Sequence, residues 1–126
     1  MEIVNTNQAP AAIGPYVQAM KIDNIVYTSG QIALVPETNE VIVGGIEAQT
    51  EQVLKNLKAV LVKAGADMNT VIKTTCFLKN MNDFALFNSI YEKHFGTHKP
   101  ARSCVAVAEL PKNVLCEVEA IAFVKK

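Results

Sequence analysis

Residues 46–65 have the sequence IEAQTEQVLKNLKAVLVKAG, and they set the architecture of the chain. Apolar residues recur in this segment at helical spacing, at Ile46, Val53, Leu57, Val60 and Ala64. Glu51 and Lys55 add a favourable i,i+4 pair, and Gly65 provides a stop signal. The spacing predicts an amphipathic helix over residues 46–64, which needs an apolar surface to cover.

The segments around this helix have the composition of strands. Their β-branched and apolar residues predict strands at residues 17–22, 25–30, 71–79, 101–108 and 114–124. A second helix is expected from Asn82, which can cap its first turn, to Gly96, which can end it. Residues 110–113 form a turn sequence, so we expect the last two strands to pair as a hairpin. This order predicts one α+β domain over residues 1–126, with two helices on one face of a five- to six-stranded sheet.

The strand at residues 101–108, ARSCVAVA, bears on the assembly of the protein. It is almost uninterrupted apolar sequence, which is typical of a strand that is buried on both faces of its sheet. Two helices cover only one face of such a sheet. The other face needs a cover that the chain does not encode, and the simplest one is a second copy of the chain. We therefore expect a homo-oligomer.

Composition limits the classes of partner. The chain has 126 residues, half of them apolar, and twelve basic side chains balance twelve acidic ones. A net charge of zero disfavours nucleic acid as a partner. The sequence has neither a signal-peptide pattern nor an apolar run long enough for a membrane span, so we expect no membrane association and a cytoplasmic location. The three cysteines form no CxxC motif, which favours reduced thiols.

Arg102 stands out because a guanidinium inside an apolar strand needs an anionic partner. Alternation along residues 114–124 places Glu117 and Glu119 on one face of that strand. If the two strands are hairpin partners, one of these carboxylates could approach Arg102. Two interpretations stay open: an ion pair inside the chain that neutralises Arg102, or a partly free guanidinium that grips the carboxylate of a ligand.

Cys104 is expected on the same face as Arg102. A nucleophilic cysteine needs a base, but the two histidines, His94 and His98, fall at the end of the second helix and in the loop after it. A core thiol is therefore the favoured interpretation. Gly96 interrupts the spacing of the histidines and no third ligand is apparent, so we predict no metal site.

Two further segments have a structural and a functional interpretation. Ser29 and Gly30 close a strand, where they either make a tight turn or let a ligand approach the backbone amide. Tyr16, after Gly14 and Pro15, either fixes a loop or presents its phenol to a pocket. No phosphate-binding glycine loop is present, so nucleotide cofactors are not indicated.

Together these segments resemble the RidA (YjgF-like) family of reactive intermediate deaminases over nearly the whole chain. The matching residues are Ala9, Pro10, Gly14, Pro15, Tyr16 and Gln18; Thr28 to Ile32; Ala48 to Thr50; Lys73 to Thr75; Asp83, Phe84, Asn88 and Tyr91; Pro100 to Val105; and Glu117 with Glu119 to Ala122. The resemblance implies a chorismate-mutase-like α+β fold with a mixed sheet. It also implies a homotrimer with the sheets inside, the helices outside and pockets at the subunit interfaces.

The resemblance also implies roles for individual residues. Arg102 would form a bidentate pair with the substrate carboxylate, and Glu117 would position a water, with the backbone at Cys104 contributing. The pocket would be lined by Tyr16, Ser29, Gly30 and Asn88. The implied reaction is hydrolysis of short 2-imino acids, formed from enamines such as 2-aminoacrylate, to 2-keto acids and ammonia without a cofactor. A nearby guanidinium would keep Glu117 ionised, so that it can accept a proton.

Two alternatives to this enzyme remain: a non-catalytic trimer that senses a small carboxylate through the same arginine, and a ribonuclease or translation inhibitor, which the neutral net charge disfavours. The sequence also departs from the family pattern in two loops. Ala33 and Leu34 stand where proline is common, and the segment at residues 96–99 is short. Both departures lie near the expected pocket and bear on the size of the substrate.

Overall fold

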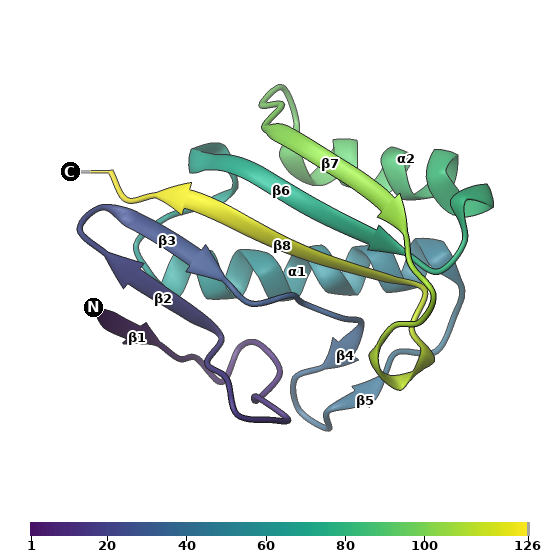
Figure 1. The fold of residues 1–126 in the computed structure, drawn as a ribbon, viewed down its shortest axis with the longest axis horizontal. Coiled ribbons are helices and arrows are strands. Elements are labelled where there is room, and N and C mark those ends of the chain that lie inside the picture. The colour runs from purple at the N-terminus through teal and green to yellow at the C-terminus, as the bar shows by residue number, and fades with distance from the viewer. Residues whose placement is uncertain (126) are drawn as a thin grey trace.

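A computed structural model describes residues 1–125, and Figure 1 shows its mixed six-stranded sheet in the order β1-β2-β3-β8-β6-β7. The strands are β1 (Glu2–Val4), β2 (Ala19–Ile22), β3 (Ile25–Thr28), β6 (Val71–Leu78), β7 (Ala101–Ala106) and β8 (Cys116–Phe123). A separate ribbon pairs β4 (Leu34–Val35) with β5 (Glu40–Val41). Every neighbouring pair in the large sheet is antiparallel except β6 and β7, which are parallel. The sequence did not predict β1, β4 or β5.

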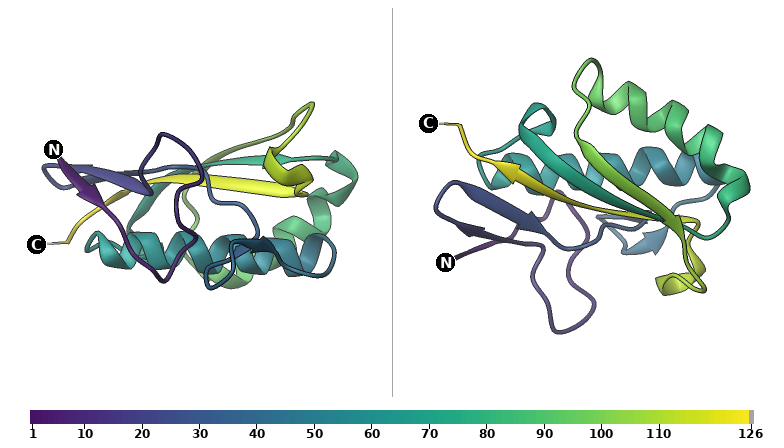
Figure 2. Two further views of the ribbon diagram at one scale, coloured as in Figure 1. Left: turned by 90° about the horizontal axis from the view of Figure 1, so that it is seen from below. Right: turned by 45° about the horizontal axis from the view of Figure 1, so that its top comes forward.

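Two helices, α1 (Ile46–Lys63) and α2 (Phe84–Phe95), pack on the same face of the sheet (Figure 2). The apolar stripe of α1 is buried, including Val53, Leu57 and Val60, so the amphipathic helix expected from the sequence is confirmed. Buried residues of β8 meet this layer: Cys116, Val118, Ala120 and Ala122. Within residues 1–125, neither helix is both long and apolar enough to cross a membrane.

The expected start of the second helix is wrong by a short turn. Residues Met81–Asp83 form a 3-10 turn before α2, and the side chain of Asn80 caps this turn by accepting a hydrogen bond of 2.8 Å from the backbone N–H of Asn82. Asn82 is already inside the turn. A capping residue has extended backbone, as Asn80 has at φ −145°, so Asn80 takes the role predicted for Asn82.

The predicted hairpin of the last two strands is also wrong. The turn forms, as a 3-10 turn at Pro111–Asn113, but the strands on its two sides are separated by β6. β7 pairs with β6 in parallel, since α2 carries the chain back to the starting edge of the sheet, and β8 is inserted between β3 and β6. The alternating buried residues of β8 need this central position, where α1 covers them.

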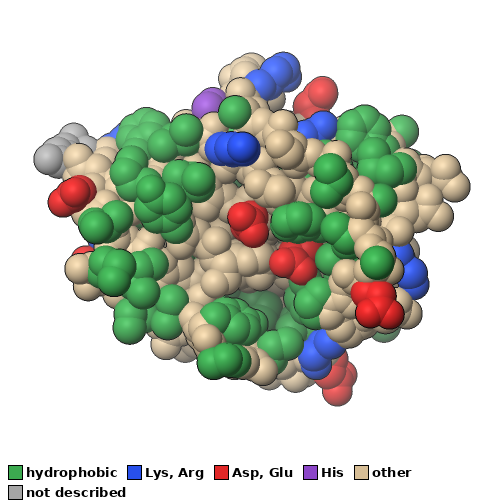
Figure 3. Space-filling view, in the orientation of Figure 1, with side chains coloured by type: hydrophobic (Ala, Val, Ile, Leu, Met, Phe, Trp, Pro, Cys, Tyr) green, Lys and Arg blue, Asp and Glu red, His purple; other side chains and the backbone are tan. Residues whose placement is uncertain are grey.

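The sheet face opposite the helices is open in the single chain. Residues 101–106 alternate between half-buried and exposed except at Ala106, so the chain itself covers only one face of β7. The burial of both faces that the sequence indicates would need a second copy. Exposed apolar side chains on the open face include Ile3, Tyr27, Val105 and Phe123. In Figure 3, hydrophobic side chains gather on both sides of acidic ones near the centre of the view. The homo-oligomer that would cover this face stays a prediction.

Candidate active site

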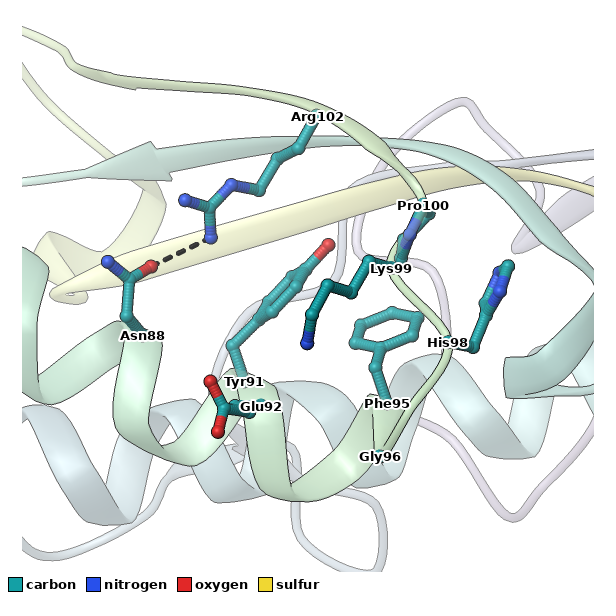
Figure 4. Close-up of a pocket in the computed structure, with 9 residues that line it drawn as sticks. All are labelled: Asn88, Tyr91, Glu92, Phe95, Gly96, His98, Lys99, Pro100 and Arg102. Carbon is teal, nitrogen blue, oxygen red and sulfur yellow. Dashed lines mark hydrogen bonds between the residues drawn. The ribbon is translucent and has the colours of Figure 1, made fainter.

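Arg102, the only arginine in the sequence, extends from β7 toward α2 (Figure 4). Its Nη1 donates a hydrogen bond of 2.8 Å to Oδ1 of Asn88. Its guanidinium carbon lies 4.9 Å from the ring centroid of Tyr91 and 5.5 Å from that of Phe84, within the range of cation–π attraction. The hydroxyl of Tyr91 is 2.7 Å from Oγ1 of Thr74 in the core, which fixes the ring. The guanidinium is therefore held in one orientation by neutral groups.

The interpretation of Arg102 as one half of an internal ion pair is wrong. The salt bridges among residues 1–125 are Lys21–Glu2 and His94–Glu51, and neither contains Arg102. Asn88 takes one of the five N–H donors of the half-buried guanidinium. Arg102 and Asn88 line a pocket of about 350 Å³ between α2 and residues 96–100, and this pocket gives an anion access to the guanidinium.

A second pocket, of about 390 Å³, contains most of the other predicted site residues. It is lined by Tyr16, Ser29, Gly30 and Glu117, together with Ile32, Pro111 and Glu119. Alternation along β8 places both glutamates on the same face of the strand, as the sequence predicted, and this is the open face of the sheet. Tyr16 is held by the backbone N–H of Ile13, which donates to its hydroxyl at 3.3 Å, and Ser29 donates from its hydroxyl to the carbonyl of Val17 at 2.6 Å.

The carboxylate of Glu117 lies directly against the backbone of Gly30. A Cβ at position 30 would come within 2.8 Å of Cδ of Glu117 and would collide with Oε2. Any side chain at position 30 would therefore displace the carboxylate, which occupies the space that a Cβ would need. Burial raises the pKa of Glu117, and the nearby charge of Glu119 raises it further. Arg102 does not contribute to this pKa within the single chain, so the expectation that a nearby guanidinium keeps Glu117 ionised stays a prediction for an assembly.

Cys104 lies on the face of β7 that carries Arg102 and packs against the core, as expected. Burial raises the pKa of its thiol, and the opposing effect of Arg102 is smaller, so the thiol is protonated at neutral pH. This supports the interpretation of Cys104 as a core thiol. The histidines are engaged elsewhere: Nε2 of His94 is 2.7 Å from Oε2 of Glu51, and Nε2 of His98 is 2.7 Å from the carbonyl of Val71.

The predicted site divides into two groups on opposite faces of the sheet. Arg102 pairs with Thr74, whose side chain is buried on the helix side, whereas Glu117 pairs with Phe77 on the open face. Side chains on opposite faces cannot meet within one chain. Arg102 and Asn88 therefore form one group, Tyr16, Ser29, Gly30 and Glu117 form the other, and Cys104 lines neither of these two pockets.

The sequence reasoning assigned no role to Tyr91, although this residue supports Arg102. Tyr91 follows Asn88 by three residues on α2, so both face β7. This i,i+3 spacing was visible in the sequence. The residue that Asn88 and Tyr91 contact was not visible in the sequence, because only the parallel pairing of β6 and β7 brings Arg102 to this helix.

Comparisons with known proteins agree with this fold. A family model described as Endoribonuclease L-PSP matches residues 6–124. The chain belongs to the RidA (YjgF-like) family. The α+β RidA fold expected from the resemblance, with two helices on a mixed six-stranded sheet, is thereby confirmed.

Individual RidA-family relatives resemble the chain over almost all of its length. A putative regulator, AldR, from Lactococcus lactis is 57% identical over 125 residues, which make up 99% of each protein. Reactive Intermediate Deaminase A, chloroplastic, from Arabidopsis thaliana is 49% identical and covers 96% of this chain with 65% of its own length. The crystal structure of Escherichia coli TdcF with bound serine is 44% identical, with a TM-score of 0.94, and covers 99% of this chain and 100% of its own. Because one relative is chloroplastic, the cytoplasmic location stays a prediction.

Proposed function

We propose that this RidA-family protein hydrolyses short 2-imino acids to 2-keto acids and ammonia. The observation that carries the proposal is the state of Arg102: its guanidinium is oriented by Asn88 and two aromatic rings, and no carboxylate among residues 1–125 pairs with it. An oriented guanidinium with free donors binds a carboxylate through two parallel hydrogen bonds. The substrate carboxylate is such a group, and its binding fixes the position of the neighbouring imine carbon.

Glu117 is the proposed proton acceptor. Its carboxylate is half-buried, burial raises its pKa from the ordinary value, and the backbone of Gly30 confines it. A carboxylate with a raised pKa is a stronger base when ionised, so it removes a proton from water more effectively. Tyr16 and Ser29 line the same pocket and would contact the substrate.

Since Arg102 and Glu117 face opposite sides of the sheet, the complete site needs two copies of the chain. We propose a homotrimer whose open sheet faces point inward, so that Arg102 of one copy at the edge strand β7 meets Glu117 of the next. Exposed apolar side chains on the open face, such as Tyr27 and Phe123, support burial against another copy.

The proposed reaction has two steps. Arg102 holds the substrate carboxylate while Glu117 takes a proton from water; the water oxygen bonds to the imine carbon, and the nitrogen gains a proton from solvent. Glu117 then returns its proton to the nitrogen, the carbon–nitrogen bond breaks, and the resulting hydroxyl loses a proton as the 2-keto acid forms. Water and imine are consumed, keto acid and ammonia are released, and no cofactor enters. Positioning and proton transfer each need to contribute only about a few kcal/mol, because such imines already hydrolyse in water.

The activity is tested by generating 2-aminoacrylate with a serine dehydratase and following release of pyruvate. The protein should accelerate release, and both Arg102→Ala and Arg102→Lys should abolish most of the acceleration, since lysine cannot form the bidentate pair. Lys93→Gln, on the outward side of α2, is the matched control for loss of a positive charge. An inactive wild type, or an Arg102→Ala variant as active as wild type, refutes the proposal.

A carboxylate sensor is the second candidate, because the 57% identical relative is named a putative regulator. The single arginine offers a direct test, since its side-chain N–H groups give one set of NMR signals. A shift of these signals with pyruvate, without deaminase activity, would favour the sensor. The family model's description raises a ribonuclease as a third candidate, but the two carboxylates in the Glu117 pocket repel phosphates. RNA cleavage that is lost in Arg102→Ala would revive it.

A further inference from the structure

The pairing of β3 with β8 is interrupted beside the Glu117 pocket. Regular antiparallel pairing ends at Tyr27 and Ile121 and resumes at Gln31 and Val118, whose backbones exchange hydrogen bonds of 2.8 and 3.1 Å. Between these two points one side has residues 28–30, the end of β3 and the two residues after it, and β8 has residues 119–120. The extra residue on one side makes a β-bulge, a feature that often re-aims groups next to active sites.

A side chain replaces a backbone group at this bulge. The backbone N–H of Ala120 donates a hydrogen bond of 3.0 Å to the hydroxyl oxygen of Thr28. In a regular continuation of the ladder, this N–H would bond to the backbone carbonyl of Thr28, as the N–H of Val124 bonds to the carbonyl of Asn24 further along. Ala120 is only 3% exposed, so its N–H needs an acceptor from the protein. The threonine hydroxyl provides that acceptor, so the backbone after Thr28 no longer has to pair with β8.

Beyond Thr28, the pairing of β3 with β2 continues in register. The N–H of Ser29 donates to the carbonyl of Gln18 at 2.9 Å, one step past the pair of Ala19 and Thr28. Gly30 then reaches the carboxylate of Glu117, and within residues 1–125 its own N–H donates no hydrogen bond. A free backbone amide at the wall of the pocket can donate to a bound substrate.

We propose that Thr28 is a positioning residue for this pocket: its hydroxyl replaces a backbone carbonyl as acceptor for Ala120, and the resulting bulge holds Gly30 against Glu117 with the Gly30 amide free. The consequence for catalysis rests on the proposed function, whereas the bulge itself does not. Thr28 lines neither of the two pockets, so it acts through its neighbours and not by touching the substrate.

Two variants of Thr28 test the hydroxyl. Thr28→Val keeps the shape of the side chain but removes the acceptor, so the N–H of Ala120 has to recruit the backbone carbonyl and draw the bulge closed. We expect kcat/KM for 2-aminoacrylate to fall about tenfold or more, mainly through kcat, because Gly30 and Glu117 are displaced. Thr28→Ser keeps the acceptor and should stay within about threefold of wild type.

The matched control is Thr50→Val. Thr50 donates from its buried hydroxyl to the carbonyl of Ile46 inside α1 and lines neither pocket. This variant removes a comparable buried hydroxyl and should lower the melting temperature without lowering kcat. An equal loss of kcat in Thr28→Val and Thr50→Val, or an equal loss in Thr28→Ser and Thr28→Val, overturns the proposal.

Hydrogen exchange on the assembled protein provides a readout that does not depend on activity. In wild type, the Ala120 amide should exchange slowly. In Thr28→Val, either its exchange accelerates or the Gly30 amide becomes protected as the ladder closes. Unchanged exchange at both amides refutes the role of Thr28. If wild type lacks deaminase activity, the proposed function fails while the exchange measurement still decides whether Thr28 holds the bulge.

Discussion

Replacing Gly30 by alanine adds one methyl group at the point where the backbone meets Glu117. The new Cβ would lie 2.8 Å from Cδ and 3.0 Å from Cγ of that side chain, and it would overlap Oε2. The backbone at position 30 has no positive φ, so alanine introduces no backbone strain. Because the half-buried Glu117 side chain can rotate away, the stability of the protein should fall by no more than about 1 kcal/mol, at the low end of the cost of overpacking.

The activity should fall much further. Displacing the proton acceptor by about 1 Å costs on the order of a hundredfold in rate. The assay follows pyruvate release from 2-aminoacrylate alongside thermal unfolding of the same preparations. Gly45→Ala is the matched control, because a Cβ there would have no heavy atom within 4 Å. If Gly30→Ala keeps kcat/KM within about threefold of the Gly45→Ala control, the confinement of Glu117 by Gly30 is irrelevant to catalysis and the reasoning is refuted.

Substitutions at three further positions test the site. Asn88→Asp should raise KM about tenfold or more, since a carboxylate 2.8 Å from Arg102 would compete with the substrate. Asn88→Ala should raise KM less. A larger KM for Asn88→Ala than for Asn88→Asp would contradict the assignment of Arg102 as the carboxylate-binding residue. Glu117 accepts a proton only when it is ionised, and the charge of Glu119 raises its pKa. Glu119→Gln should therefore lower the pKa of Glu117 and move the acidic limb of the kcat profile to lower pH; an unmoved limb would show that Glu119 has no such effect. Cys104→Ser should retain kcat within about threefold, because burial keeps the thiol protonated, and a loss of a thousandfold would point to a covalent nucleophile instead.

Local patterns in the sequence predicted the elements of the fold well. The helix expected at residues 46–64 is α1, and alternation along β8 correctly placed Glu117 and Glu119 on one face of that strand. These features follow from the periodicity of burial over a few residues, which the sequence displays directly. The order of the strands does not follow from periodicity, and so the hairpin of the last two strands was wrong.

The error in strand order concealed the division of the site. Neighbouring strands would have let Arg102 and Glu117 share a face, but β6 lies between them and the register directs their side chains apart. Whether Arg102 was neutralised inside the chain could not be decided from its neighbours in sequence either. Its partners, Asn88 and Tyr91, come from a helix that only the β6–α2–β7 crossover brings to β7.

Mixed assemblies test most directly whether one site takes Arg102 and Glu117 from two copies of the chain. Arg102→Ala and Glu117→Gln chains, each inactive alone, are co-expressed with different affinity tags, and assemblies that carry both tags are purified. In a cyclic trimer that contains both kinds of chain, about a third of the interfaces join an intact Arg102 to an intact Glu117. We expect deaminase activity near a third of wild type; mixed assemblies as inactive as either parent would contradict a site shared between copies.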